Sequence, residues 1–201
     1  MDLQPWYLLY LIAVVMATCP GEAKKVCTSG TRNGGARCIS PWQFMSSSNI
    51  YLIKSNMSYK GITCIKARTL EKDPEKQTLS HVVSFYVNAS QTWLAMNATY
   101  NPLKTHTTGR AKAFTSVYNG ETTNYTFSLL GTYYAIVRKE KGSSSEDLRN
   151  SCELWVNDKY FNRNCTAKKE RCEKKFRTIC GPNPEISYDC YNCNQPKRGD
   201  N

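Results

Sequence analysis

Residues 111–129 have the sequence AKAFTSVYNGETTNYTFSL, and this stretch predicts a β-hairpin in the middle of the chain. Apolar and polar residues alternate on both sides of Asn119-Gly120, which is the period of a strand with one buried face. Asn-Gly is a preferred pair for a two-residue hairpin loop, because both residues tolerate a positive φ. The stretch therefore predicts two antiparallel strands, at 111–118 and 122–129.

The same alternation of β-branched, aromatic and polar residues recurs on both sides of this hairpin. It predicts six further strands, at 49–56, 61–68, 80–88, 92–100, 132–138 and 151–157. Turn residues separate the segments, among them Asn101-Pro102 and Gly131. The period then changes: residues 167–180 carry one apolar stripe of a helix, and Gly181-Pro182 ends it.

Eight short strands followed by one amphipathic helix predict a mainly β protein. An eight-stranded antiparallel up-and-down barrel suits this order, since it leaves no open sheet edge and its interior has room for one small ligand. The C-terminal helix would pack outside the barrel. A β-sandwich is the alternative that the pattern leaves open. We expect an N-terminal segment at 24–48, the barrel and helix at 49–181, and a tail at 182–201.

The first residues predict export. Residues 6–16 are apolar, too short to cross a bilayer and of the length of a signal-peptide core. We expect a signal peptide at 1–23, cleaved after Ala23, with cleavage after Ala17 as the alternative. No later segment could insert into a membrane, and the ten cysteines also suggest a secreted, extracellular protein. Cleavage after Ala23 would leave nine cysteines, an odd number.

The chain carries a formal net charge of +11. Secretion argues against nucleic acid as the partner, and the bases between Lys168 and Arg177 are interpreted as one solvated helix face. That interpretation leaves affinity for acidic cell surfaces open. Five sequons predict a glycoprotein: Asn56, Asn88, Asn97, Asn124 and Asn164.

A glycosylated Asn must point outward, so its neighbours along a strand indicate which side chains point inward. On this argument the interior contains Tyr51, Ile53, Val83, Phe85, Val87, Leu94, Met96, Tyr100, Tyr125, Phe127 and Leu129, and we add the aromatic residues Phe114 and Tyr134. Such an interior suits a small-molecule pocket. A barrel filled by the same side chains, binding nothing, is the alternative.

Several segments resemble the tick salivary lipocalins, the histamine-binding protein family. They are Tyr51-Leu52-Ile53, Gly61-Ile62-Thr63-Cys64, Cys152-Glu153-Leu154-Trp155-Val156, and Cys172 followed by Phe176 and Cys180. Trp42 stands where the family has a Trp under the barrel, and the likeness covers most of the mature chain. The resemblance implies a lipocalin-like barrel that sequesters small host mediators, either biogenic amines such as histamine and serotonin or eicosanoids such as leukotrienes and thromboxane. This would suppress host inflammation and haemostasis.

The resemblance also implies disulfides. Cys64 would be tied to the C-terminal tail at Cys193 or Cys190, and Cys152 would pair with Cys172 or Cys180. Zinc or redox chemistry at Cys190-x-x-Cys193 is disfavoured, because no matching His pair exists. We expect no metal and no cofactor.

In the amine-binding members two elements hold the ligand, and only one is present. Glu153-Leu154-Trp155 with Cys172 matches the second element, whereas the Cys-Asp pair of the first is absent. Glu153 would either pair with an ammonium beside the ring of Trp155, or be a framework residue paired with Arg138. An acidic lipid would instead use a base, for which the candidates are Arg138, Lys112 and Lys54.

The sequence favours three other functions less. An enzyme is not indicated, because His81 and His106 are the only histidines and neither lies in a recognisable catalytic pattern. Arg198-Gly199-Asp200 could bind a host integrin, although a terminal tail presents such a triplet poorly. A protein-binding barrel aimed at complement or a chemokine is the third alternative. We expect a monomer.

Overall fold

The computed structural model describes residues 39–104, 109–142, 150–161, 166–181 and 186–188. Their elements follow in chain order: α2 (Pro41–Met45), β1 (Asn49–Ser55), β2 (Ile62–Asp73), β3 (Thr78–Val87), β4 (Thr92–Lys104), β5 (Ala111–Tyr118), β6 (Glu121–Leu130), β7 (Tyr134–Lys141), β8 (Asn150–Asn157), η2 (Asp158–Phe161), α3 (Thr166–Cys180) and β9 (Ile186–Ser187). The predicted signal peptide and most of the N-terminal segment lie outside these residues.

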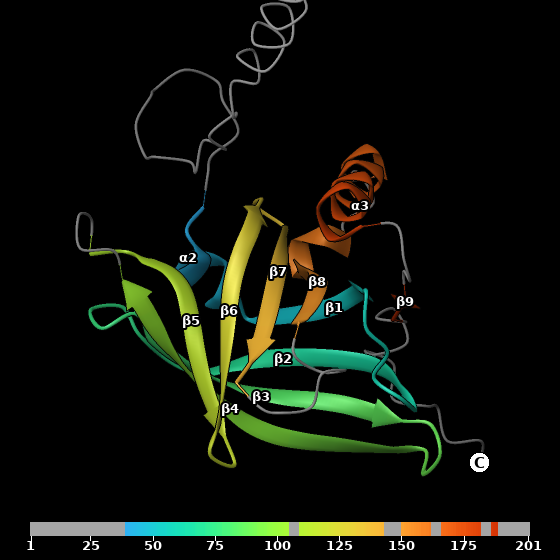
Figure 1. The fold of residues 1–201 in the computed structure, drawn as a ribbon, viewed down its shortest axis with the longest axis horizontal. Coiled ribbons are helices and arrows are strands. Elements are labelled where there is room, and N and C mark those ends of the chain that lie inside the picture. Colours follow the sequence, from blue (N-terminus) through green and yellow to red (C-terminus); the bar gives the residue numbers. More distant parts are fainter. Residues whose placement is uncertain (1–38, 105–108, 143–149, 162–165, 182–185, 189–201) are drawn as a thin grey trace, which may run out of the picture. The chain divides into compact units, whose positions relative to one another are not determined.

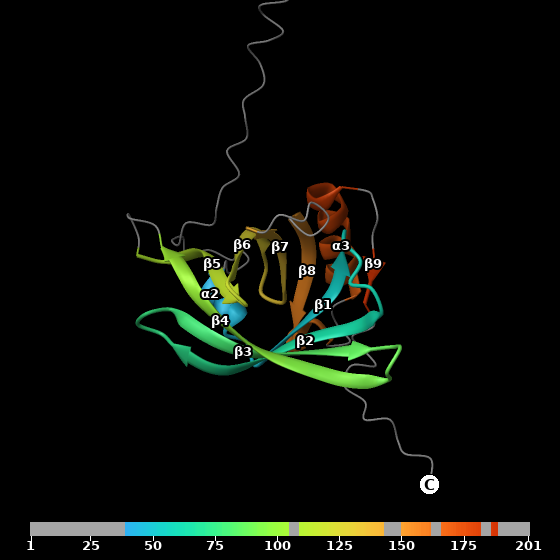
Figure 2. The same ribbon diagram turned by 60° about the horizontal axis from the view of Figure 1, so that its bottom comes forward.

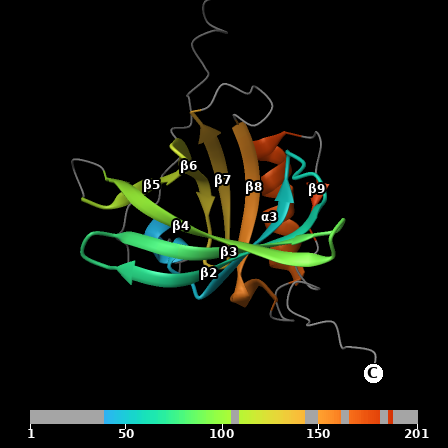
Figure 3. The same ribbon diagram turned by 90° about the horizontal axis from the view of Figure 1, so that it is seen from below.

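Strands β1 to β8 form a closed antiparallel barrel, as the sequence predicted (Figure 1). Each strand from β2 to β7 pairs with the next, and β1 pairs with β8, β2 and β9. At the closure, Tyr51 lies opposite Val156 on one side and opposite Lys66 on the other. Figure 3 shows β2, β3 and β4 crossing one side of the interior and β5 to β8 lying behind them. Closure rules out the β-sandwich.

The β5–β6 hairpin has the predicted loop. Asn119 and Gly120 have φ values of 50° and 78°, and Tyr118 pairs with Glu121 across the turn. Both loop residues need the left-handed region, which Asn and Gly enter at low cost.

The prediction that Asn101-Pro102 ends a strand is wrong. Strand β4 continues through it to Lys104 and changes partner there: it pairs with β3 up to Tyr100 and with β5 from Asn101 onward. From Asn101 onward β4 pairs with β5 alone, so its other edge forms no ladder hydrogen bonds. Pro102, which has no backbone N–H, is tolerated at such an edge.

The short helix α2 packs against side chains inside the barrel. Ser40 and Gln43 form a reciprocal capping box at its start. The helix then buries Phe44 and Met45 in a cluster that includes Phe114, and Trp42 packs against the same cluster. Figure 2 shows α2 beside the curved strands β4 and β5. One part of the barrel interior is therefore filled by the chain itself.

Helix α3 covers the outer face of β7 and β8, as expected. Its Cys172 and Phe176 are buried in one cluster with Ile136 and Leu154. Gly181 ends the helix with a φ of 86°, and its N–H donates to the carbonyl of Arg177 at 3.1 Å. No helix in the described part of the chain is long and apolar enough to cross a membrane.

Candidate functional site

The inner wall of the barrel is set by which face each strand buries. Two clusters of inward-pointing side chains contain seven of the predicted residues: Val83, Phe85, Tyr100, Phe114, Tyr125, Phe127 and Trp155. Trp155 packs against both clusters. Leu94 and Met96 lie opposite Phe85 and Val83 across the β3–β4 pair, so they share that inner face. Leu94 is 49% exposed.

Four predicted interior residues lie on the outer face instead. Tyr51 and Ile53 are buried under α3, and Leu129 and Tyr134 pack against the same outer cluster. For the residues of β1 and β6 the cause is irregular pairing, because register shifts occur between Leu52 and Lys54 and between Phe127 and Leu129. An extra residue in a strand reverses the faces of all residues beyond it.

Arg138 also points outward. Its Nη2 donates a 2.9 Å hydrogen bond to the carbonyl of Ile179 at the end of α3. The two other bases predicted to receive a lipid carboxylate are not inside the barrel either. Lys54 lies 3.7 Å from Glu173 of α3, and Lys112 is exposed on β5.

Glu153 lies on the inner face and is fully buried. Its Oε1 accepts hydrogen bonds from Tyr59 Oη, from Lys139 Nζ at 3.2 Å and from Ser151 Oγ at 3.2 Å. Its Oε2 accepts from Trp155 Nε1 at 2.7 Å. Four donors from the chain thus surround this carboxylate, which is what a buried charge requires.

Lys139 is the cationic residue that the sequence analysis missed. It follows Arg138 on β7 and pairs with Ser151 of β8, two residues from Glu153 on the same face. Its Nζ lies 2.8 Å from Tyr59 Oη, 5.2 Å from the ring centroid of Tyr59 and 5.9 Å from that of Tyr125. The alternation along β8 and β7 could have found it, had the register of the two strands been known.

The ion pair holds Lys139 in its charged form. Burial disfavours the ammonium, but the negative charge of Glu153 and the neighbouring phenols outweigh burial and raise the pKa of Lys139 well above its ordinary value. Burial, and next the charge of Glu153, raise the pKa of Tyr59, so its hydroxyl stays protonated and donates to the carboxylate. The Lys139 side chain is 18% exposed, whereas that of Glu153 is 0% exposed.

A row of rings continues from Lys139 into the barrel. The centroids of Tyr125 and Tyr100 are 5.3 Å apart, and those of Tyr100 and His81 are 5.0 Å apart. His81 is fully buried, its Nε2 donates to the carbonyl of Met45 at 2.9 Å, and its Nδ1 has no hydrogen-bond partner among the described residues. Burial lowers the pKa of His81 to about 4 despite the bond to Met45. His81 thus ties α2 to the inner wall as a neutral ring.

The described cysteines agree with part of the predicted framework. Cys152 and Cys180 form a disulfide with 5.6 Å between their Cα atoms. Cys172, the alternative partner, is a free buried thiol, and burial raises its pKa to about 11. Cys64 is disulfide-bonded, and since the other described cysteines are accounted for, its partner lies outside the described residues. Cys193 is among those undescribed residues.

The remaining predicted sites lie partly inside and partly outside the described residues. Asn164, His106 and the triplet Arg198-Gly199-Asp200 lie outside the described residues. Among the remaining sequons, Asn88 and Asn97 are exposed, Asn124 is half-buried, and Asn56 is half-buried with its Oδ1 accepting from the backbone N–H of Cys152 at 2.7 Å.

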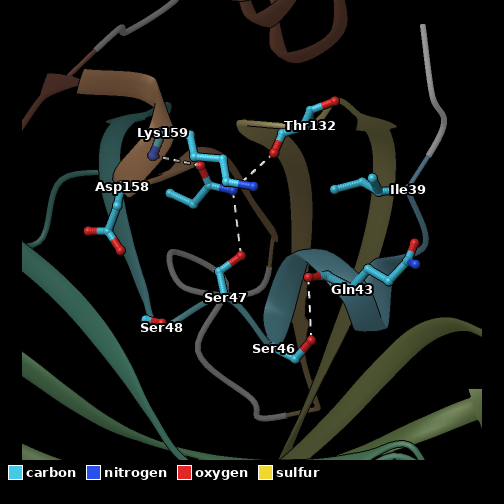
Figure 4. A pocket seen from close by; sticks show the side chains of 9 residues that line it. Ile39, Gln43, Ser46, Ser47, Ser48, Thr132, Asp158 and Lys159 are labelled. Atoms are coloured by element: carbon cyan, nitrogen blue, oxygen red, sulfur yellow. Dashed lines mark hydrogen bonds between the residues drawn. The ribbon is translucent and has the colours of Figure 1, made fainter. Parts of the chain in front are cut away.

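A polar pocket of about 540 Å³ lies between α2 and the end of β8 (Figure 4). Asn157 Nδ2 donates to the carbonyl of Thr132 at 3.0 Å and to Ser47 Oγ at 3.5 Å, and Ser46 Oγ donates to the carbonyl of Gln43 at 3.4 Å. Of these bonds, the one from Asn157 to Ser47 joins the segment after α2 to the end of β8. In the described part of the chain no group of three His, Cys, Asp or Glu residues could hold a metal ion.

The chain is similar to known proteins in sequence and in fold. The family model "Tick histamine binding protein" matches residues 39–196. The fold is similar to that of Per a 4, a major allergen from cockroaches, at 13% identity and a TM-score of 0.50, covering 83% of this chain and 96% of that one. No curated protein sequence matches the chain.

Two structures with bound amines share the fold to the same degree. The serotonin complex of AM182 is 16% identical with a TM-score of 0.50, covering 81% of this chain and 97% of that one. The tryptamine complex of the amine binding protein of Rhodnius prolixus is 12% identical with a TM-score of 0.50, covering 79% and 91%. At these identities the likeness concerns the fold.

Proposed function

The chain belongs to the tick histamine binding protein family, and on this premise we propose that it is a secreted lipocalin that sequesters a small host mediator inside its barrel, without turnover. The ligand we favour is an apolar acid of the leukotriene or thromboxane class. Its carboxylate would lie at Lys139, and its hydrocarbon chain would lie along the aromatic side chains of the inner wall.

One observation carries this choice: within the ion pair, solvent reaches Lys139 but not Glu153. On this basis we expect a molecule that enters the barrel to meet the Lys139 ammonium and not the Glu153 carboxylate. An ammonium has three N–H donors, and hydrogen bonds to Tyr59 and Glu153 occupy two of them. The third donor can form a charge-assisted hydrogen bond to an acid, which is stronger than a neutral one.

The surroundings suit the apolar part of such a ligand. The inward-pointing side chains Phe85, Tyr125, Phe127 and Trp155 are only partly buried. Burying their exposed area against a hydrocarbon chain is favourable at about 25 cal/mol per Å². Aromatic walls with few convergent polar groups are typical of small-molecule pockets.

A biogenic amine is the second candidate, favoured by the family itself and by Glu153 beside the Trp155 indole. The difficulty lies in Lys139. Its ammonium already takes the place of a ligand cation, 3.2 Å from Glu153 Oε1 and near the rings of Tyr59 and Tyr125. An amine would have to displace this tethered cation or bind beside it, against like-charge repulsion.

Native mass spectrometry and calorimetry on the deglycosylated protein would test the proposal. The panel contains histamine, serotonin, a leukotriene, a thromboxane analogue and the methyl ester of the same leukotriene. We expect one-to-one binding of the acids, and weaker binding of the ester because it lacks the charge that pairs with Lys139. Binding of the amines alone would overturn the choice of ligand, and equal binding of acid and ester would exclude Lys139 as the anchor.

A further inference from the structure

The outer face of α3 carries a cluster of bases that the proposed function does not use. Arg171, Lys174 and Lys175 are all exposed. Residues spaced by three and four positions are neighbours on a helix surface, so these three side chains lie side by side. Arg177 is exposed one turn further along. The opposite face of α3 packs Cys172 and Phe176 against the barrel, so the basic side chains point to solvent.

Carboxylates of the described chain do not neutralise this cluster. Of the two acids on α3, Glu173 is paired with Lys54 at 3.7 Å, and Glu170 is exposed. None of the described carboxylates forms an ion pair with Arg171, Lys174 or Lys175. Like charges at this spacing destabilise a helix, so the cluster is more favourable with bound anions than without them.

We propose that Arg171, Lys174 and Lys175 form a binding site for a sulfated polysaccharide of the heparan sulfate type. Such a chain presents a linear series of sulfate groups, which matches a row of bases along one helix face. The site is separate from the barrel interior, since the side chains of α3 that face the barrel are the apolar ones. The protein would then be held on polysaccharide-coated surfaces while its barrel binds a ligand.

An anionic membrane is the competing partner, and the composition of the helix argues against it. Helices that lie on membranes insert an apolar face below the head groups. Here the apolar face of α3 is buried against β7 and β8, and the exposed face offers bases and Thr178 but no large apolar side chain.

Heparin affinity at increasing salt tests the site. Log affinity falls linearly with log salt concentration, and each basic contact removed should reduce the slope by about 1. For the triple variant Arg171→Gln, Lys174→Gln, Lys175→Gln we therefore expect the slope of log affinity against log salt concentration to be smaller by about 3. The matched control, Lys60→Gln, Lys72→Gln, Lys104→Gln, removes the same charge from exposed residues elsewhere and should lose much less.

Two further measurements complete the test. Glu170→Gln should strengthen heparin binding, because it removes the exposed carboxylate of α3. Desulfated heparin should bind weakly. If the two triple variants lost equal heparin affinity, net charge alone would explain the binding and the proposal would be overturned. Binding to phosphatidylserine vesicles without binding to heparin would also overturn it. Lys139→Met should leave heparin binding unchanged, which separates this site from the barrel site.

Discussion

Lys139 and Glu153 form an ion pair on the inner wall of the barrel, with 3.2 Å between Nζ and Oε1. Trp155 and Ser151 complete the hydrogen bonding of the carboxylate, and Tyr59 lies between the two charges, donating to Glu153 and accepting from Lys139. The pair makes the site electrically neutral. The two charges differ in exposure, because the Lys139 side chain is 18% exposed and that of Glu153 is 0% exposed.

Replacing the ammonium should exchange the ligand preference. Lys139→Met keeps the length of the side chain but removes its charge, leaving Glu153 without a counter-ion. We expect the affinity for an acidic lipid to fall roughly 10- to 100-fold, the equivalent of one hydrogen bond to a charged group. The affinity for histamine or serotonin should rise, since a ligand ammonium could then pair with Glu153. Calorimetry on both ligands measures the two effects.

The control for this exchange is Lys112→Met, which removes an exposed lysine of β5. It should change neither affinity by more than about twofold, the size expected for a screened surface charge. If Lys139→Met weakened both ligands equally, the variant would have damaged the pocket as a whole and the exchange would be excluded.

The sequence contained most of the information for the fold and much less for the site. Alternation and Asn119-Gly120 predicted the strands and a hairpin, because these signals are local. The inner faces of β1 and β6 were predicted wrongly in part, because the register shifts after Leu52 and Phe127 leave no mark in composition. A sequon fixes the face of a strand only up to the next bulge.

Lys139 was missed for a related reason. Its neighbour Arg138 is an equally plausible base, and one residue of register decides which of the two faces the interior. That register is set by pairing with β8, where Arg138 lies opposite Cys152 and Val137 opposite Glu153. Glu153 itself was predicted as a site residue from its motif, whereas its four donors come from segments up to 94 residues away in sequence.

Removing the charge of Glu153 should destabilise the folded protein. Glu153→Gln leaves the Lys139 ammonium without its carboxylate, and loss of one partner of a buried pair costs about 3 kcal/mol. The partial exposure of Lys139 moves the expected cost toward the lower end of the usual range. Urea unfolding followed by tryptophan fluorescence would measure it.

The double variant Lys139→Met, Glu153→Met serves as the control for this prediction. It removes both charges and leaves apolar side chains of similar volume, so its stability should lie closer to wild type than that of Glu153→Gln. A double variant that loses the sum of both single losses would show that the two residues do not act as a pair.

His81 should make the stability fall in mild acid. Burial lowers its pKa to about 4 in the folded protein, against an ordinary value of 6.5. Between these values the unfolded chain binds a proton that the folded chain does not, so this stability is fully present above pH 6.5 and is lost as the pH falls toward 4. A shift of this size corresponds to about 3 kcal/mol.

Comparison with His81→Gln isolates this contribution from that of the carboxylates. Glutamine does not titrate and can still donate a hydrogen bond to the carbonyl of Met45. The unfolding free energy of wild type minus that of the variant should therefore fall from pH 7 to pH 4. A difference that stays constant over this range would contradict a neutral His81 in the folded protein.

The three cysteines at the contact between α3 and β8 should behave differently: Cys152 and Cys180 form a structural disulfide, and Cys172 is a protected thiol. The Cys152–Cys180 bridge closes a loop across a sequence separation of 28 residues, so Cys152→Ser with Cys180→Ala should cost about 3 kcal/mol through the unfolded state. Cys172, in the same cluster, is a free thiol that is 0% exposed.

Cys172 should react with a thiol reagent such as DTNB only at the rate of unfolding, because the reagent cannot reach it in the folded protein and burial keeps it protonated. Cys172→Ala should preserve the bridge and abolish this unfolding-limited reaction, which mass spectrometry of the labelled peptide would assign. Rapid labelling of Cys172 in the native protein would mean that α3 detaches from β8 without global unfolding.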